Sequence, residues 1–371
     1  MKFLLAPDKF RGTFTASEVC ALLSEGIRQE DPGAVLDAAP MADGGEGTLE
    51  AVLRAQGGTM VPVRARGPLG EWIDAAYGVT AAGAAVIESA RVCGLRCLPA
   101  GEPRPLEATT YGLGQVVATA LEAGARTILL GLGGTATTDG GAGMAEALGY
   151  RISREEAEGE VVHTIDASMA HPGLATARVT ALCDVSHPLL GPAGSAAVFG
   201  PQKGAGPAEV AVLESRLAAL ARGAARLTGR PEAELAGDPG AGAGGGLGMG
   251  AAVFLGARLV PGAIFLAGLM LLSRRAEEAD VVVTGEGSLD SQTLGGKVVS
   301  AVLELAAEAG RPALVAAGRW DGTLPERRPE PTEVLAGADQ GGGIVARDGL
   351  IRLGRHIARR ARGLAKPEGR C

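Results

Sequence analysis

The sequence predicts a two-domain α/β protein with mostly parallel sheets. The chain has 371 residues, more than a domain with a single hydrophobic core usually contains. At about 150 residues per domain, this length predicts roughly two domains. Short apolar segments alternate with segments of helical period, the pattern of βαβ units. Hydrophobic residues make up 46% of the chain and charged residues 21%. Because this composition is close to that of ordinary globular domains, the whole chain can form packed cores.

Five short apolar segments predict the buried strands of these sheets, because each is rich in β-branched or aliphatic residues and ends near a loop of polar or glycine residues. They are Phe3–Ala6, Thr127–Leu132, Val179–Cys183, Val281–Thr284 and Ala313–Ala317.

Helices of crossover length are expected between and after these strands. The first has Thr15 or Ser17 as a capping residue, since a side-chain oxygen there can accept from a backbone N–H of the first turn. The arginine-rich segment from Arg347 to Arg370 is interpreted as a terminal helix with a solvated face. The other expected helices cover Ala16–Arg28, Tyr111–Ala123, Glu209–Leu227 and Lys297–Ala309.

The pattern changes between Thr59 and Ile87, where short alternating stretches separated by glycine turns predict antiparallel strands and the start of a second domain. A second unusual segment, Leu247–Leu272, is strongly apolar. Arg258 and Pro261 divide it into pieces too short to span a bilayer, so we predict buried helices there.

Composition also limits the partners and the compartment. Aromatic residues are only 3% of the chain and the net charge is −7, which argues against a nucleic-acid partner. The N-terminal apolar run is too short for a signal peptide, so we expect a cytoplasmic protein without a membrane partner. Five cysteines form no C-x-x-C pair, which favours reduced thiols; Cys93 and Cys97 could share one helix face, with a structural role favoured over metal binding.

Acidic residues come after the predicted strands in five glycine-flanked places. Ligands of open α/β sheets bind beyond the carboxyl ends of the strands. Glycines let the backbone approach a ligand closely, whereas carboxylates repel phosphate unless a divalent cation intervenes. The pattern therefore suggests phosphate, Mg²⁺ and a hydroxyl group that loses a proton. The acids are Asp8, Asp43 with Glu46, Asp139, Asp184, and Glu286 with Asp290.

Basic residues in glycine-rich turns fit the same chemistry, because such side chains suit phosphate or carboxylate contacts. They are Lys9, Arg11, Lys203 and Lys297.

Familiar motifs are missing or misplaced. Gly296-Lys297 has no Walker A glycine before it, and the G-x-G-x-x-G match at Gly240–Gly245 comes after no strand. No G-x-S-x-G or H-E-x-x-H occurs. From the residues alone, three interpretations stay open: a kinase, a metal-assisted lyase or hydrolase that acts on a small sugar acid, and a non-catalytic nucleotide-sensing module.

At these segments the sequence resembles the bacterial type I glycerate kinases, over nearly its whole length. The family usually has Ser and Lys where this chain has Lys9 and Arg11, and the chain departs from the family after Gly318. The matching stretches are Ala6–Thr13, Ala42–Thr48, Gly133–Gly143, Cys183–Val185, Phe199–Ala205, Gly240–Gly250, Thr284–Thr293 and Gly296-Lys297.

The resemblance implies phosphorylation of D-glycerate by ATP with Mg²⁺, with 2-phosphoglycerate favoured over 3-phosphoglycerate. It also implies two α/β domains, one of them Rossmann-like and mostly parallel and the other with a mixed sheet, and an active site in the cleft between them. The Rossmann-like domain is expected to be discontinuous, with residues 1–60 and about 265–371, and the second domain to span residues from about 61 to 264. A homodimer is compatible with the sequence.

We assign four groups of site residues as a hypothesis for in-line phosphoryl transfer. The catalytic group is Asp184 or Asp290 as base, with Lys203 and Lys297 to neutralise charge on the phosphoryl group; the substrate group is Asp8, Lys9, Arg11 and Ser291; the nucleotide group is Gly133, Gly134, Thr135, Gly140, Gly141, Gly244 and Gly245; the metal group is Asp43, Glu46, Asp139 and Glu286.

Overall fold

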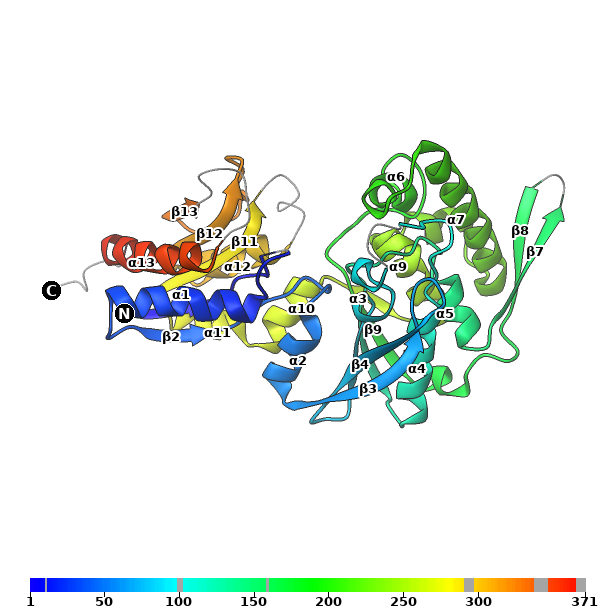
Figure 1. Ribbon diagram of the computed structural model, residues 1–371, viewed down its shortest axis with the longest axis horizontal. Coiled ribbons are helices and arrows are strands. Elements are labelled where there is room, and N and C mark those ends of the chain that lie inside the picture. Colours follow the sequence, from blue (N-terminus) through cyan, green and yellow to red (C-terminus); the bar gives the residue numbers. More distant parts are fainter. Residues whose placement is uncertain (11, 99–102, 158–159, 290–296, 337–345, 365–371) are drawn as a thin grey trace. The chain divides into compact units, whose positions relative to one another are not determined.

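A computed structural model of the chain describes residues 1–10, 12–98, 103–157, 160–289, 297–336 and 346–364. It forms two compact units (Figure 1): unit 1 comprises Met1–Asp43 and Gly262–Cys371, and unit 2 comprises Gly44–Pro261. A search of the described helices finds none with the length and apolar character needed to cross a membrane.

Unit 1 contains a five-stranded sheet with the order β13-β12-β11-β1-β2, in which every neighbouring pair is parallel. Its strands are β1 (Lys2–Leu5), β2 (Val35–Ala38), β11 (Val281–Leu289), β12 (Ala313–Trp320) and β13 (Thr332–Ala336). Its helices are α1 (Ala16–Glu30), α10 (Gly262–Leu269), α11 (Leu272–Glu277), α12 (Val298–Glu308) and α13 (Arg347–Leu364).

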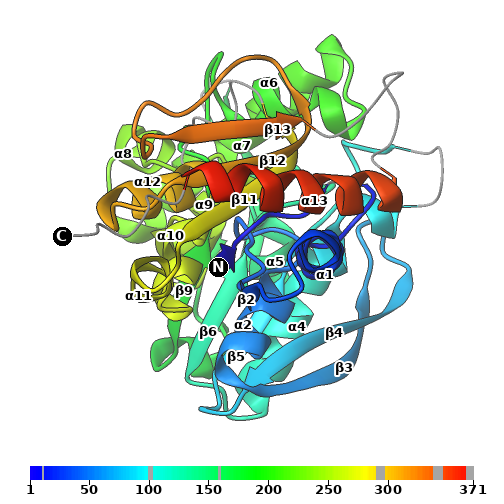
Figure 2. The ribbon, with the colours of Figure 1, turned by 90° about the vertical axis from the view of Figure 1, so that its left-hand side faces the viewer.

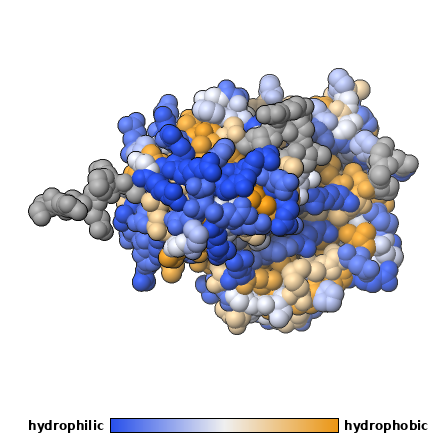
Figure 3. All heavy atoms as spheres, turned by 60° about the vertical axis from the view of Figure 1, so that its left-hand side comes forward, coloured by the Kyte–Doolittle hydropathy of each residue, from blue (hydrophilic) through white to orange (hydrophobic). Residues whose placement is uncertain are grey.

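The helices α1 and α13 pack against each other on unit 1, and Figure 2 shows α13 running across the view above α1, which is seen end-on. Their backbones approach closely, since a Cβ atom at Gly26 would collide with the carbonyl oxygen of Ile351. Thr15 caps α1 in a capping box with Glu18, as expected. The arginines of α13 are mostly exposed and form ion pairs, for example Arg359 with Glu30 at 2.9 Å. Figure 3 shows a broad hydrophilic area on the face in view, beside hydrophobic areas.

Unit 2 contains a mixed six-stranded sheet with the order β10-β9-β6-β5-β4-β3. The strands β3, β4 and β5 pair antiparallel, whereas β5, β6, β9 and β10 are parallel. A separate antiparallel pair, β7–β8, extends from the unit (Figure 1). The strands are β3 (Gly58–Arg66), β4 (Trp72–Thr80), β5 (Ala85–Glu88), β6 (Thr127–Gly131), β7 (Arg151–Ala157), β8 (Glu160–Asp166), β9 (Arg178–Leu182) and β10 (Arg258–Val260).

Helices of unit 2 surround this sheet and form a second apolar cluster around α7, which includes Leu213, Leu217 and Leu220. The α-helices are α2 (Thr48–Gln56), α3 (Ala90–Cys93), α4 (Tyr111–Glu122), α5 (Ala142–Ala147), α6 (Ser195–Phe199), α7 (Pro207–Thr228), α8 (Glu232–Gly237) and α9 (Ala243–Phe254); the 3₁₀-helices are η1 (Leu95–Cys97), η2 (Pro172–Ala175) and η3 (Pro201–Lys203).

The predicted α/β class, with one parallel and one mixed sheet, is confirmed, as are the five predicted strands and the main helices. The expectation of helices throughout Leu247–Leu272 is wrong in one place, because Arg258–Val260 forms β10 beside β9. Gly256 ends the preceding helix with a positive φ of 60°, and Leu259 packs on the core. Cys93 and Cys97 do not share one helix, since Gly94 separates α3 from η1 with extended backbone.

Candidate active site

Three chain segments of unit 2 meet at the carboxyl edge of its sheet. The N–H of Gly133, two residues after β6, donates to the carbonyl oxygen of Gly44 at 3.1 Å. A Cβ atom at Gly44 would collide with the carbonyl oxygen of Leu182, the last residue of β9, and Gly44 has a φ of 84°. Glycine is therefore required where the Gly44 loop packs between the ends of two parallel strands.

Asp184 lies at the same edge, two residues after β9 ends. It is half-buried, and the N–H of the preceding residue, Cys183, donates to the carbonyl oxygen of Val260 at 3.0 Å. Burial, reinforced by the charge of Asp184, raises the pKa of Cys183 to about 11. The thiol therefore stays protonated at neutral pH.

The predicted nucleotide glycines pack largely against one another. The N–H of Gly140 donates to the carbonyl oxygen of Gly245 at 3.0 Å, and a Cβ atom at Gly245 would collide with the carbonyl oxygen of Thr137. Gly244, Gly245 and the next glycine have φ values of 61°, 78° and 84° within the first turn of α9. These glycines shape two interlocking loops. Of the predicted set, Gly134 is exposed, and Gly133 and Gly244 are half-buried.

Asp139 is held by backbone and hydroxyl donors. Its carboxylate accepts from the N–H of Thr110 at 2.8 Å, from the hydroxyl of Thr110 at 2.8 Å, from the N–H of Gly141 at 3.1 Å and from the N–H of Gly143 at 3.2 Å. These contacts join the start of α5 to the residue that precedes α4. They give Asp139 a structural role in the loop; its role as a metal ligand stays a prediction.

Lys203 is almost fully buried, with 4% of its surface exposed. Its ammonium group donates to the carbonyl oxygen of Thr137 at 2.6 Å and to the hydroxyl of Thr135 at 3.3 Å. Burial lowers the pKa of Lys203 to about 8, although Cys93 and Asp139 oppose this shift. The Lys203 side chain thus stabilises the loop after β6 through its hydrogen bonds to Thr135 and Thr137.

In unit 1, two carboxylates and one lysine gather beyond the ends of β1 and β2. The ammonium group of Lys9 lies 3.1 Å from a carboxylate oxygen of Asp43 and 3.6 Å from one of Asp8. Burial raises the pKa of Asp8 to about 7; Lys9 opposes the shift, while Asp43 and Glu286 add to it. Within the described residues no group of three or more Asp, Glu, His or Cys side chains is placed to hold a metal ion, so these carboxylates would supply only one or two ligands to Mg²⁺, with water and substrate phosphate as the others.

Other predicted site residues are placed separately. Glu46 pairs with Arg96 at 3.2 Å in unit 2. Lys297 is the half-buried N-cap residue of α12, with extended backbone. Arg11, Asp290 and Ser291 lie outside the described residues.

One acid at the carboxyl edge of unit 2 was missed by the sequence analysis. Glu88, the last residue of β5, is 2% exposed and accepts from the N–H of Leu49 and from the Nε of Arg91, each at 2.7 Å. Arg91 also pairs with Glu50 on α2. The available signal was an acid directly after the apolar run Ala85–Ile87, but the antiparallel interpretation of that region hid the fact that β5 pairs parallel to β6.

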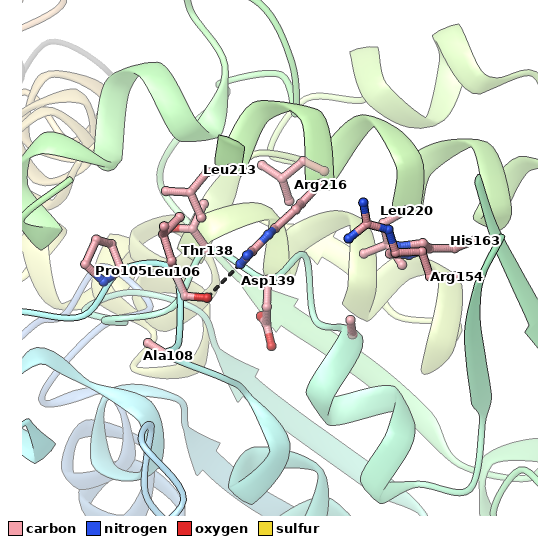
Figure 4. Close-up of a pocket in the computed structure, with 12 residues that line it drawn as sticks. Pro105, Leu106, Ala108, Thr138, Asp139, Arg154, His163, Leu213, Arg216 and Leu220 are labelled. Atoms are coloured by element: carbon pink, nitrogen blue, oxygen red, sulfur yellow. Dashed lines mark hydrogen bonds between the residues drawn. The ribbon is translucent and has the colours of Figure 1, made fainter. Parts of the chain in front are cut away.

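Unit 2 also contains a cavity of about 270 Å³ next to the loop after β6 (Figure 4). Figure 4 shows Arg216 entering from α7, and Arg154 and His163 from the β7–β8 pair. The guanidinium group of Arg216 donates to the carbonyl oxygen of Leu106 at 2.6 Å. The lining residues are Pro105, Leu106, Ala108, Thr138, Asp139, Ala142, Arg154, His163, Leu213, Arg216, Leu217 and Leu220.

Comparisons with known proteins agree over most of the chain. The sequence profile of the Glycerate kinase family matches residues 3–336. A glycerate kinase of Halalkalibacterium halodurans is 39% identical, covering 85% of this chain and 84% of the relative. A glycerate 2-kinase of Escherichia coli is 37% identical, covering 86% and 85%. A crystal structure described as glycerate kinase 2 from Salmonella typhimurium LT2 is 34% identical, with a TM-score of 0.79 and 98% coverage of both chains.

Proposed function

This chain belongs to the glycerate kinase family, which makes it a phosphotransferase with an alcohol group as acceptor, and on that premise we propose that it phosphorylates D-glycerate at the 2-hydroxyl. ATP is the co-substrate that a kinase of this family uses. The 2-position is supported by the Escherichia coli relative, which is named a glycerate 2-kinase. We place the chain in the type I branch because of its matching motifs, and expect it to act in the cytosol.

The observation that carries the proposal is the convergence of glycine loops and acids at the carboxyl edges of parallel strands. In unit 2, Gly44 and Gly133 contact each other beside the end of β9, which leads into Asp184. In unit 1, Asp8, Lys9 and Asp43 gather at the ends of β1 and β2. Such edges are where open α/β sheets bind their ligands.

The predicted catalytic and substrate residues have the following roles in this proposal. Asp184 orients or deprotonates the acceptor hydroxyl, and the alternative base is Asp290. Lys9 or Arg11 binds the glycerate carboxylate, and Asp8 and Ser291 are the other residues proposed to contact this substrate. The loop that contains Gly133 and Gly134 faces the phosphates, while Lys203 and Lys297 supply positive charge. Because the ammonium group of Lys203 already donates to Thr137, its part in this proposal is chiefly to hold that loop in place. The expectation that the reaction occurs in a cleft between two domains stays a prediction.

Because no three acids of the described residues are placed to hold a metal ion together, Mg²⁺ would take one or two carboxylates of this chain, with water and the phosphates of ATP as its other ligands. Asp43 and Glu286, near Asp8, are the residues that would hold it in unit 1; Glu46 and Asp139 are the candidates in unit 2. When bound, the ion would neutralise charge on the phosphates. Lys9 now pairs with Asp43, so binding of the ion there would require this lysine to turn toward another anion, such as the substrate carboxylate.

The decisive experiment is glycerate-dependent release of ADP by purified protein with Mg²⁺ and ATP, followed by phosphorus NMR of the product. We expect turnover with D-glycerate and a 2-phosphoglycerate resonance, and little turnover with L-glycerate or tartronate. A 3-phosphoglycerate resonance would correct the position of transfer. ATP binding without turnover on any hydroxy acid would refute the proposed reaction and favour a nucleotide sensor, and turnover of a sugar acid without ATP would favour a lyase or hydrolase.

A further inference from the structure

Two consecutive residues at the end of β5 bind two different segments of unit 2. The carboxylate of Glu88 accepts from the N–H of Leu49, in the first turn of α2, at 2.7 Å. The hydroxyl of Ser89 donates to the carbonyl oxygen of Gly133 at 3.3 Å, and its N–H donates to that of Gly131 at 2.9 Å. Both residues are buried, with 2% and 0% of their surface exposed. The end of β5 is therefore connected to the start of α2 and to the loop after β6.

The helix α2, which packs on β5 (Figure 2), depends on Glu88 for its N-terminal cap. The first N–H groups of a helix have no partner within the helix. The N-cap residue of α2 is Gly47, whose φ is 97° and which has no side chain to accept from them. Glu88 supplies this acceptor from a distant strand, and a negative charge at this end of a helix is also favoured by the helix dipole. Glu88 thus fixes the start of α2 and, with it, the Gly44 loop (Gly44–Gly47) that leads into the helix.

Arg91 holds the Glu88 carboxylate in this position. Its Nε donates to Glu88 at 2.7 Å, and its guanidinium group also pairs with Glu50 on α2. Burial raises the pKa of the Glu88 carboxyl. The Leu49 N–H and Arg91 oppose this shift, while Glu50 adds to it. A buried ion pair often gives no more stability than apolar side chains of the same volume, so stability alone does not explain an acid at this position.

The two segments held by Glu88 and Ser89 also touch each other. The N–H of Gly133 donates to the carbonyl oxygen of Gly44 at 3.1 Å, and a Cβ atom at Gly133 would lie 2.8 Å from the Cα of Gly45. These are contacts between backbones, which have no flexible side chain to absorb a shift. A displacement of the first turn of α2 would therefore change the position of the Gly44 loop relative to Gly133.

We propose that Glu88 and Ser89 are positioning residues of the kinase: together they set the position of the Gly44 loop relative to the loop that begins with Gly133 and Gly134, without contacting a substrate. The inference rests on the proposed function, which places the phosphates at the second loop. In-line phosphoryl transfer depends mainly on positioning, and a misplacement of about 1 Å can lower the rate by about 10²-fold. A change at Glu88 or Ser89 should therefore act on kcat, although neither side chain reaches the reacting atoms.

The first test compares Glu88→Gln and Ser89→Ala with wild-type enzyme in glycerate-dependent ADP release, at a temperature where urea denaturation shows each variant to be folded. We expect kcat to fall about ten- to hundredfold in Glu88→Gln, which loses the charge opposite Arg91. In Ser89→Ala, which loses one hydrogen bond, the fall should be about three- to tenfold. The KM for D-glycerate should change less than about threefold. A purely structural role would lower the urea midpoint but leave the kcat of the folded enzyme unchanged.

Two control variants of unit 2 remove similar interactions elsewhere. Glu214→Gln replaces an acid that accepts from the N–H of Gly191 at 2.6 Å. Tyr150→Phe removes a hydroxyl that donates to the carbonyl oxygen of Phe254 at 2.8 Å. Both should keep the wild-type kcat, although Tyr150→Phe should be less stable than the wild type. A fall in their kcat as large as that in Glu88→Gln would show that any loss of stability in unit 2 lowers the rate, and would overturn the inference.

The double variant tests whether the two residues act together. Because both fix the contact between the same two segments, the loss of either one already disturbs it. The kcat of the double variant should therefore be no more than about twofold below that of Glu88→Gln alone, and effects that multiply would overturn the joint role. Folded single variants with the wild-type kcat would also overturn the inference; if Glu88→Gln does not fold, Ser89→Ala alone decides. Wild-type protein without glycerate-dependent ADP release would instead refute the proposed function, so the two failures are distinguishable.

Discussion

Replacement of Asp139 by asparagine separates a structural carboxylate from a metal ligand. Its carboxylate accepts four hydrogen bonds of 2.8–3.2 Å from Thr110, Gly141 and Gly143. Three of these donors, the N–H and hydroxyl of Thr110 and the N–H of Gly143, share one carboxylate oxygen, which asparagine can replace with an uncharged amide oxygen. The NH₂ group of asparagine then faces the N–H of Gly141, which loses its acceptor. A hydrogen bond to a charged group contributes about 1.5–3 kcal/mol. The loss of one such bond, with weakening of the others, should lower the free energy of unfolding of unit 2 by about 2–4 kcal/mol.

The two tryptophans of the chain allow this loss to be assigned to one unit. Trp72 lies in β4 of unit 2 and Trp320 in β12 of unit 1, so urea denaturation of a Trp320→Phe background, monitored by fluorescence, reports on unit 2. Asp139→Asn should reduce the midpoint in the same way with and without Mg²⁺. Asp74→Asn is the control, because Asp74 is exposed and its ion pair with Arg64 spans 3.7 Å; we expect a change below about 0.5 kcal/mol. An unchanged midpoint together with a raised Mg²⁺ requirement would refute the structural interpretation and identify a metal ligand.

The geometry makes three further outcomes testable. Glu88→Gln should keep an acceptor for α2 but lose the charge opposite Arg91, and should destabilise unit 2 by about 1–3 kcal/mol in the same urea assay. The pKa of Asp8 is about 7 in the folded protein and 3.8 in the unfolded chain. Its contribution to the stability of unit 1 is therefore present below pH 3.8 and is lost as the pH rises to about 7. Asp8→Asn should remove this fall in stability, measured by the fluorescence of Trp320 in a Trp72→Phe background. Gly245→Ala places a Cβ atom against Thr137 at a positive φ and should cost more than about 2 kcal/mol.

Each of these three has a contradicting result. Gly256→Ala is the control for the glycine, since Gly256 also has a positive φ but a Cβ atom there would meet open space; equal losses for the two variants would show that backbone conformation alone matters. A Glu88→Gln protein as stable as the wild type would show that the charge opposite Arg91 contributes nothing. If stability of unit 1 between pH 4 and 7 falls equally in Asp8→Asn, other groups titrate in that range.

Strand ends were the most predictable part of the fold and of the candidate site. Apolar runs such as Val281–Thr284 are long enough and β-branched enough to identify buried strands, and parallel pairing then brings the residues after each strand to one edge. Asp8 and Asp43 illustrate this, since they are far apart in sequence yet both lie within 4 Å of the Lys9 ammonium group. The pattern predicted which residues lie at an edge, because that depends mainly on local sequence.

The partners of these residues could not be predicted, because they depend on packing between distant segments. The glycines near Gly140 and Gly245 look like ligand loops in sequence, but much of their role is to let two backbones touch. Lys203 looks in sequence like a phosphate-binding cation in a glycine turn, yet it is buried and donates to the backbone of the loop that it stabilises. The strand β10 was hidden because three residues carry almost no periodic signal.

The order in which strands join the sheet of unit 1 sets an order for its folding during synthesis. Phe3 in β1 pairs with Val281 in β11, and α1 packs on α13, in which Ile351 contacts Gly26. Unit 2 is continuous from Gly44 to Pro261, so its strands can all pair before β11 leaves the ribosome. β1 can pair with β2 at once, but Phe3 must wait for Val281, 278 residues later, and Gly26 for Ile351, 325 residues later, at a synthesis rate of about 5–20 residues per second. During that interval the β11-facing edge of β1 and the apolar side of α1 lack their later partners, and this is the stage at which the nascent chain is most exposed to aggregation or to chaperone binding.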